Sequence, residues 1–212
     1  MNLFLLAADP RTAARWHCDK HVVKMILEIC QLLYTAWHQS RTPFVWSDVC
    51  PHAPYRPTHR NHPVAHWIRQ RAEHYVWACA LGAALCEEYT RRYEKTHKCE
   101  SHLQRLRDMG FPPHMHDETY TPPVKKHASQ GCPRDCVTFE CALPDTCVVR
   151  TGDQVDAIKS YQKYYGTKHW VMTWNRGKDP APPWYKHCPV PAPVKRKRVT
   201  VKTSRAKKKV RV

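Results

Sequence analysis

A chain of 212 residues, 42% of them hydrophobic, is long enough to bury a core and is typical of one domain with extensions. The formal net charge of +17 indicates a polyanionic partner, and favours nucleic acid over an acidic membrane because the basic segments lack an amphipathic apolar face. The apolar run at residues 3–8 is too short for a signal peptide or a membrane span. We therefore expect an intracellular protein whose 11 cysteines are mostly free thiols.

The positive charge is concentrated at the C-terminus. Residues 189–212 contain ten lysines and arginines and no acid, whereas residues 1–188 contain 25 basic and 18 acidic residues. The C-terminal segment has too few hydrophobic residues to fold, so the sequence predicts a disordered tail. Its basic clusters fit a nuclear address or a nonspecific nucleic-acid arm. The candidate DNA contacts in the tail are Lys195, Arg196, Lys197 and Arg198.

Residues 1–188 are expected to form one compact, mainly α-helical bundle with long irregular loops. Asn2 to Leu6 has the pattern of a short buried strand or extended segment, and Thr12 to Trp16 that of a helical turn. Helical periodicity then predicts a long helix from Lys20 to about Trp37. Asp19 is predicted to cap this helix, where its carboxylate meets the positive end of the helix dipole.

One face of that helix is predicted to carry charge. At about 100° per residue, basic groups fall in one stripe beside a single carboxylate. Such a stripe fits a phosphate-binding surface that holds an acid near the chemistry, or simply a solvated face. Asp19 and Glu28 are the acids best placed for catalysis, whereas no nucleophile–base pair or glycine-rich phosphate loop stands out. The stripe consists of His17, Lys20, His21, Lys24 and Glu28.

A second polar cluster precedes the next predicted helix. The proline that ends the cluster fits the first turn of a helix, so the cluster should lie at a helix N-terminus, where anions bind readily. The helix should run from Val64 to about Tyr93, with Gly82 marking a bend or a close helix contact. The cluster is Thr58, His59, Arg60, Asn61, His62 and Pro63.

Later segments give shorter signals. Ser101 with Gln104 has the form of a capping box, and Gly110 should end that helix. Asp153 should start another helix, which ends at Gly166 and turns Val155, Ile158 and Tyr161 inward. Residues 111–150 are predicted to be an irregular loop rich in cysteine and proline, and residues 168–187 an irregular wrap rich in tryptophan and proline.

The cysteine-rich loop allows two interpretations. Its four cysteines are spaced by three, four and five residues, wider than the pairs of common structural zinc sites. A zinc site completed by His127 is one interpretation, and a loop with unpaired or locally bridged thiols is the favoured one. No metal or other cofactor is therefore assigned. The cysteines are Cys132, Cys136, Cys141 and Cys147.

Trp184, Tyr185 and Lys186 combine two aromatic rings with a cation. Such a group suits stacking on an exposed base beside its phosphate. The alternative is an aromatic plug that closes the core.

Three blocks of the sequence together resemble the pyrimidine-dimer DNA glycosylase family of phages, large DNA viruses and bacteria. They are residues 19–28 (Asp-Lys-His-Val-Val-Lys-Met-Ile-Leu-Glu), residues 58–63 (Thr-His-Arg-Asn-His-Pro) and residues 182–185 (Pro-Pro-Trp-Tyr). The resemblance covers about residues 2–186 and omits the tail, and the cysteine loop has the character of an insertion. It implies a compact, mainly helical domain that binds double-stranded DNA and flips a base out of the stack.

The resemblance also implies a chemistry. In the understood phage member, the amine of the processed N-terminal residue attacks the sugar C1′ and forms a Schiff base, a glutamate assists, and strand cleavage at the abasic site follows. Here the acid would fall near Asp19, and the amine would belong to Met1 or Asn2. Asn2 is bulkier than the residues after which an initiator methionine is normally removed, so a retained Met1 would displace the amine by one residue.

The sequence thus favours a DNA-repair glycosylase, with abasic-site lyase activity as an extension. Its rival is a non-enzymatic DNA-binding or DNA-packaging protein that keeps the fold. In the enzyme, the stripe, the polar cluster at residues 58–63 and the aromatic group would contact DNA. The expected location is intracellular, and for a viral protein the host nucleus or the virion.

Overall fold

The computed structural model describes residues 2–40, 54–115, 139, 141–168, 172–177 and 179–185. The predicted mainly helical fold is confirmed, because six α-helices and a single two-stranded hairpin are found among these residues. No helix in these ranges is long and apolar enough to cross a membrane. The tail at 189–212 and the predicted zinc ligands His127, Cys132 and Cys136 lie outside the residues that the structure describes.

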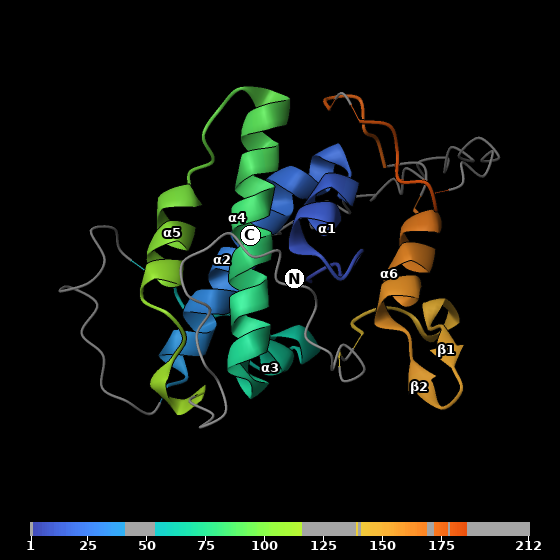
Figure 1. Ribbon diagram of the computed structural model, residues 1–212. Coiled ribbons are helices and arrows are strands. Elements are labelled where there is room, and N and C mark those ends of the chain that lie inside the picture. The colour runs from blue at the N-terminus through green and yellow to red at the C-terminus, as the bar shows by residue number, and fades with distance from the viewer. Residues whose placement is uncertain are drawn as a thin grey trace, which may run out of the picture.

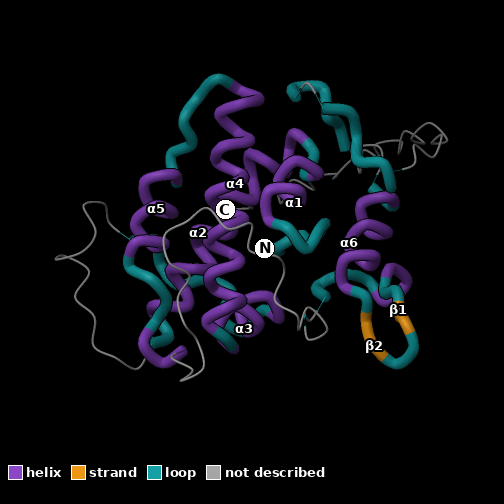
Figure 2. Tube along the Cα trace, in the orientation of Figure 1, coloured by secondary structure: helices purple, strands orange, loops and turns teal. Residues whose placement is uncertain are grey.

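Helix α4, Ala72–Tyr93, lies at the centre of the molecule, and four other helices pack around it (Figure 1). These are α1, Pro10–Trp16; α2, Asp19–His38; α3, Pro63–Gln70; and α5, Glu100–Asp108. Helix α6, Ala157–Gly166, lies to one side of this group together with the hairpin of β1, Arg150–Thr151, and β2, Gln154–Val155 (Figure 2). The described residues also include two 3-10 helices, η2 at Pro113–Met115 and η4 at Asp145–Cys147.

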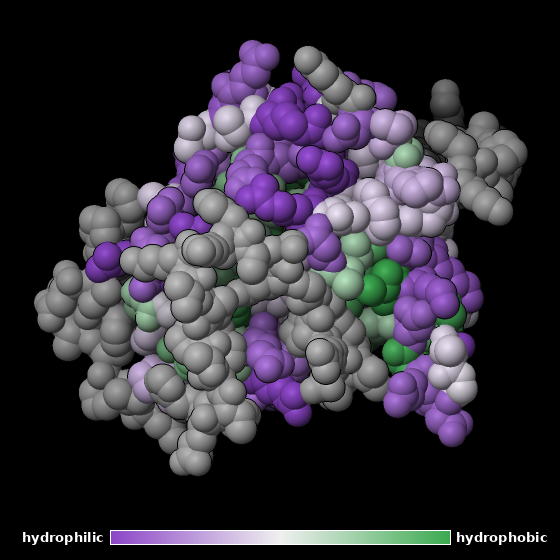
Figure 3. Space-filling view, viewed as in Figure 1, coloured by the Kyte–Doolittle hydropathy of each residue, from purple (hydrophilic) through white to green (hydrophobic). Residues whose placement is uncertain are grey.

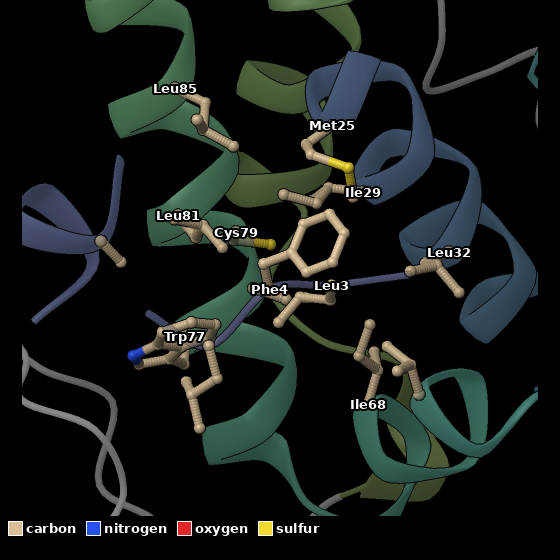
Figure 4. Close-up of a cluster of buried hydrophobic side chains, with 14 of the residues drawn as sticks. Leu3, Phe4, Met25, Ile29, Leu32, Ile68, Trp77, Cys79, Leu81 and Leu85 are labelled. Carbon is tan, nitrogen blue, oxygen red and sulfur yellow. The ribbon is translucent and has the colours of Figure 1, made fainter. Parts of the chain in front are cut away.

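The N-terminal segment runs through the core. Leu3 and Phe4 are buried and lie among side chains of α2, α3 and α4 (Figure 4). The structure assigns no strand to residues 2–7, so the segment is buried without ladder hydrogen bonds. Apolar burial, rather than sheet pairing, therefore holds this end of the chain.

Helix α2 confirms the predicted periodicity, but its cap differs from the prediction. The N-cap residue is Cys18, and Asp19 is the first residue of the helix. The Asp19 carboxylate does not bond the helix N–H groups; it accepts from the backbone N–H groups of Asn175, at 2.7 Å, and Arg176, at 3.2 Å. Asp19 was predicted to cap its own helix, but its carboxylate instead binds a segment far away in the sequence.

The predicted helix from Val64 to Tyr93 is wrong as a single element. It is divided at Arg71, which is extended with φ −144° and ψ 147°, and not at Gly82. The break is stabilised by His74, whose Nδ1 lies 2.7 Å from the Trp67 carbonyl in the last turn of α3, and whose ring stacks on the Trp67 indole at 4.2 Å. That carbonyl would otherwise be one of the unsatisfied groups at a helix end.

Gly82 marks a close contact between helices, one of the two roles predicted for it from the sequence. A Cβ atom at this position would lie 3.0 Å from the Leu103 side chain of α5 and 3.2 Å from the Ile29 side chain of α2. The glycine therefore lets α4 approach both neighbours.

Three further helix ends can be compared with the predictions. Gly110 follows α5 with φ +78°, which confirms the predicted stop. The capping box is wrong, because Cys99 is the N-cap of α5 and Ser101 lies inside the helix. The start of α6 is also corrected: Asp156 accepts from the Lys159 N–H at 2.9 Å as N-cap, whereas Asp153 lies in the hairpin turn. Helix α6 ends at Gly166 as predicted.

A buried ion-pair network joins the first helices to α4. The Arg92 side chain, 1% exposed, donates to Glu88 at 2.5 Å, to Asp19 at 3.0 Å, and to the carbonyls of Arg15 and His17 at 2.9 Å. These oxygens lie at the C-terminal end of α1, at the first residue of α2 and on α4 itself. The network therefore fixes the end of α1 and the start of α2 against α4.

Replacing Arg92 with methionine should lower the free energy of unfolding by about 3 kcal/mol, because two buried carboxylates lose their one buried cationic partner; Glu88 keeps Arg91, and Asp19 keeps two backbone N–H groups. Urea unfolding measures the change. The matched control is Arg11→Met, which removes an ion pair to Glu87 between side chains 62% and 59% exposed and should cost about 1 kcal/mol or less. Equal losses in the two variants would contradict the structural role of the network.

Candidate active site around Glu28

Glu28 is a buried carboxylate on the side of α2 that meets the N-terminal segment. Its Oε2 accepts the backbone N–H of Asn2 at 2.7 Å, and its Oε1 pairs with the Lys24 ammonium at 2.9 Å. The Lys24 side chain is 60% exposed, so the site is open to solvent on that side. The structure thus brings together Asn2, Lys24 and Glu28, three of the residues that the sequence singled out.

The second polar cluster approaches the same region. Thr35 of α2 bonds Thr58 twice, by accepting its N–H at 3.1 Å and donating to its carbonyl at 3.2 Å. These bonds dock the segment before α3 onto the helix that carries Glu28. His62 is the N-cap of α3, and Pro63 occupies the first turn as predicted.

His62 lies within electrostatic range of Glu28. Burial lowers the pKa of His62, neighbouring positive charges including His59 lower it further, and the Glu28 carboxylate opposes them. His59 holds φ +49°, an uncommon backbone conformation for this residue type. Asn61, Arg60 and His59 are exposed beside it. The cluster therefore presents donors and positive charge near the carboxylate.

Asp19, the other predicted acid, does not reach this site. It lies nine residues before Glu28, which is about 14 Å along the helix at 1.5 Å per residue. Its oxygens are occupied by Arg92, by the two N–H groups of residues 175 and 176, and by the Thr173 hydroxyl at 3.3 Å. The geometry favours a structural role for Asp19, and Glu28 as the acid beside the N-terminal segment.

Two histidines of the predicted stripe differ from that prediction. The His17 side chain is fully buried and cannot reach a phosphate in this structure. His21 is partly exposed, stacks on Phe4 at 4.6 Å, and has Nδ1 2.6 Å from the Tyr165 hydroxyl. Burial lowers the pKa of His17 to about 4 and that of His21 to about 3, so both are neutral at pH 7. Lys20 and Lys24 are the exposed cations of the stripe.

The predicted aromatic group packs on the fold. Trp184 lies edge-on to Trp16 at 5.7 Å and to Tyr165 at 6.1 Å, and Tyr185 lies 4.6 Å from Trp174. These contacts favour the aromatic-plug interpretation. Lys186 lies outside the residues that the structure describes, as do Met1 and the basic residues at 195–198.

The cysteines that the structure describes are all free thiols, as predicted from the sequence. Cys141 is half-buried and Cys147 is buried. Within the described ranges no group of three or more histidine, cysteine or acidic residues could hold a metal ion.

Two residues with long-range contacts were not among the candidate site residues predicted from the sequence. They are Arg92, which joins α1 and α2 to α4, and Tyr161, which was predicted only to face inward. Tyr161 in fact donates from its hydroxyl to the Asn2 side-chain oxygen at 3.0 Å. The partners are 159 residues apart, so no local pattern could reveal the contact.

Residues 1–101 match the family described as pyrimidine dimer DNA glycosylase. The match confirms the predicted resemblance and includes Asn2, Glu28 and the cluster at 58–63. It supports a DNA-repair role of the pyrimidine-dimer glycosylase type, and this family implies DNA binding. No curated protein and no solved structure matches the chain.

The histidines at positions 17 and 21 predict a loss of stability in acid. Because their folded pKa values lie below 6.5, the usual pKa of histidine, the unfolded chain binds protons more readily, and stability falls as the pH drops from about 6.5 toward 4. For His17 alone the loss should reach about 3 kcal/mol at 1.36 kcal/mol per pKa unit. Urea unfolding at pH 7.5, 5.5 and 4.5 measures it, with His17→Asn as the variant that should flatten the slope. A wild-type stability that does not change over this range would contradict the assignment.

Proposed function

We propose that the protein is a DNA glycosylase that removes a damaged pyrimidine from double-stranded DNA by using the amine at its N-terminus, with Glu28 as the acid–base group. The observation that carries the proposal is the 2.7 Å hydrogen bond between the Asn2 backbone nitrogen and the buried Glu28 carboxylate. The match of residues 1–101 to the pyrimidine dimer DNA glycosylase family supports the same reading.

The reaction can be written with its atoms balanced. The neutral amine attacks C1′ of the damaged nucleotide, and the bond from C1′ to the base nitrogen breaks. The base takes the bonding pair and a proton from solvent, and it stays joined to the neighbouring pyrimidine by the cyclobutane ring. The new C–N bond becomes a Schiff base when the amine proton is lost and the sugar oxygen is protonated as the ring opens. Glu28 is placed to accept the proton that the amine loses and to donate a proton to the sugar oxygen, as general acid–base catalysis requires.

The Schiff base also accounts for a lyase step. The iminium nitrogen withdraws electrons and acidifies C2′, so removal of a C2′ proton expels the 3′ phosphate and cleaves the strand. Glu28 is again the nearby base. Strand cleavage at an abasic site is therefore part of the proposal.

The amine is either that of Met1 or, after removal of Met1, that of Asn2. If Met1 is removed, the nitrogen bonded to Glu28 is itself the nucleophile. If Met1 stays, its amine is one residue beyond, and consecutive Cα atoms are about 3.8 Å apart. In either case Glu28 lies beside the N-terminal end of the chain. Measuring the intact mass of the protein shows whether Met1 is retained or removed.

The polar and basic side chains on α2 and at the start of α3 are proposed to hold the DNA backbone. Lys20 and Lys24 are exposed on α2, His59, Arg60 and Asn61 are exposed before α3, and His62 is partly exposed as the N-cap of α3. Backbone N–H groups and positive side chains at such a place suit phosphate oxygens. The basic tail would add affinity without sequence choice.

The second candidate is a DNA-binding or DNA-packaging protein without catalysis. The ten basic residues of the tail favour it, because they bind any polyanion. The two candidates differ in chemistry rather than in affinity.

Borohydride trapping on three duplexes tests the proposal. One duplex carries a single cyclobutane pyrimidine dimer, one an abasic site, and one is undamaged. We expect a covalent adduct on the first two and none on the third. Salt-sensitive binding to all three duplexes without any adduct would favour the packaging protein, provided that alkali treatment of the incubated dimer duplex, which cleaves the strand at any abasic sugar, also gives no cleavage.

Changing Glu28 to glutamine should lower the trapping rate by about 100-fold or more, the range of general acid–base catalysis. The amide still accepts the Asn2 N–H but cannot take up a proton, so DNA affinity should change only a few-fold. Single-turnover trapping and a binding titration measure the two effects.

Glu87→Gln makes the same change at an exposed acid of α4, whose side chain is 59% exposed, and should trap at the wild-type rate. A Glu28→Gln protein that traps as fast as this control would exclude Glu28 as the acid–base group.

A further inference from the structure

The Asn2 side chain is held in a closed ring of hydrogen bonds. Its Nδ2 donates to the Ala142 carbonyl at 2.9 Å, the Ala142 N–H donates to the Tyr161 hydroxyl at 3.2 Å, and that hydroxyl donates to Asn2 Oδ1 at 3.0 Å. The same Oδ1 also accepts the Leu3 N–H at 2.8 Å. Both lone pairs of the amide oxygen are therefore used, and one amide hydrogen is fixed.

The ring joins parts of the chain that are far apart in sequence. Ala142 lies 140 residues and Tyr161 159 residues from Asn2. Both lie outside residues 1–101, the part that matches the glycosylase family. Tyr161, on α6, is fully buried and meets the Phe4 ring edge-on at 5.8 Å. Apolar side chains are visible beside α6 on the side that faces the N-terminal segment (Figure 3).

The Tyr161 hydroxyl is suited to this place. Burial raises its pKa well above the usual value for a tyrosine, so the group stays protonated and can donate at every working pH. It donates one hydrogen bond and accepts another in the ring. The hydrogen bonds of the Tyr161 hydroxyl therefore keep the same donors and acceptors as the pH changes.

A chain end without such contacts is normally mobile. Catalysis by an N-terminal amine requires the opposite, since a displacement of about 1 Å at a reacting group can cost about 100-fold in rate. The ring fixes the Asn2 side chain, and the bond to Glu28 fixes its backbone nitrogen. Together they fix both the side chain and the backbone nitrogen of Asn2.

We infer that Tyr161 and the Ala142 backbone are positioning groups: by holding the Asn2 amide they keep the N-terminal amine aligned with Glu28 for attack on the sugar. The inference rests on the proposed function. It gives α6 and the segment before it, which the family match does not include, a part in the reaction. These contacts would determine the position of the nucleophile and would not affect which DNA substrate is bound.

Tyr161→Phe tests the role by removing one oxygen atom. We expect the maximal rate of adduct formation on the abasic duplex to fall 10- to 100-fold, with the Kd for that duplex changed less than twofold. Hydrogen exchange of the backbone amides in residues 2–6 should become faster. The matched control is Tyr164→Phe, which removes a hydroxyl from the same helix and should leave rate, Kd and exchange at wild-type values.

A second substitution guards against misfolding of the first. Asn2→Gln keeps a neutral amide but lengthens the side chain by one methylene, so the ring of hydrogen bonds cannot close with the same geometry. Asn2 is only partly buried, whereas Tyr161 is fully buried, so the substitution at residue 2 disturbs the core less. The same fall in maximal rate, at an unchanged Kd, is expected.

The outcomes separate the two claims. A wild-type protein that forms no adduct on either damaged duplex overturns the proposed function, and the positioning role with it. A wild-type protein that forms the adduct, beside Tyr161→Phe and Asn2→Gln proteins that form it equally fast, overturns the positioning role alone. Slow trapping caused by weaker DNA binding would also contradict it, because a positioning group acts on the bound complex.

Discussion

The arrangement of the molecule depends on the burial of one guanidinium group. Arg92 is 1% exposed and joins two carboxylates, Asp19 and Glu88, to the carbonyls that end α1. A buried charge is tolerated only when its partners satisfy it, so these contacts are mutually required. Asp19 in turn binds the backbone of residues 173–176. The direction in which α2 leaves this network determines where Glu28, nine residues later, is presented.

Helix α2 therefore carries two acids with different tasks. Asp19, at its first turn, is enclosed by an arginine and backbone N–H groups and holds the fold. Glu28, itself buried, meets the nitrogen of Asn2 and one exposed lysine at the edge of the proposed site. The N-terminal segment reaches Glu28 because its leucine and phenylalanine side chains are buried in the core (Figure 4). The same hydrophobic burial that stabilises the fold thus places the backbone nitrogen of Asn2 beside the carboxylate.

Local signals in the sequence were sufficient for much of this arrangement. Periodicity predicted α2, the proline at residue 63 predicted the start of α3, and the glycine at residue 110 predicted the end of α5. The break at Arg71 could not be predicted in this way, because it depends on the imidazole of His74 bonding a carbonyl of the preceding helix. The structural role of Asp19 could not be predicted from the local sequence either, because its partners lie 73 and 156 residues away. Glu28 was found from its place in a stripe, but only the fold showed that it meets the N-terminal segment.

The most direct measurement is the location of the reduced crosslink in the protein. After borohydride trapping on the abasic duplex, the adduct is digested and the modified residue is identified by tandem mass spectrometry. The account predicts that the sugar fragment is attached to the amine of the N-terminal residue, Met1 or Asn2. Attachment to a lysine side chain, such as the nearby Lys24, would contradict it, because the Asn2 nitrogen beside Glu28 would then not mark the nucleophile.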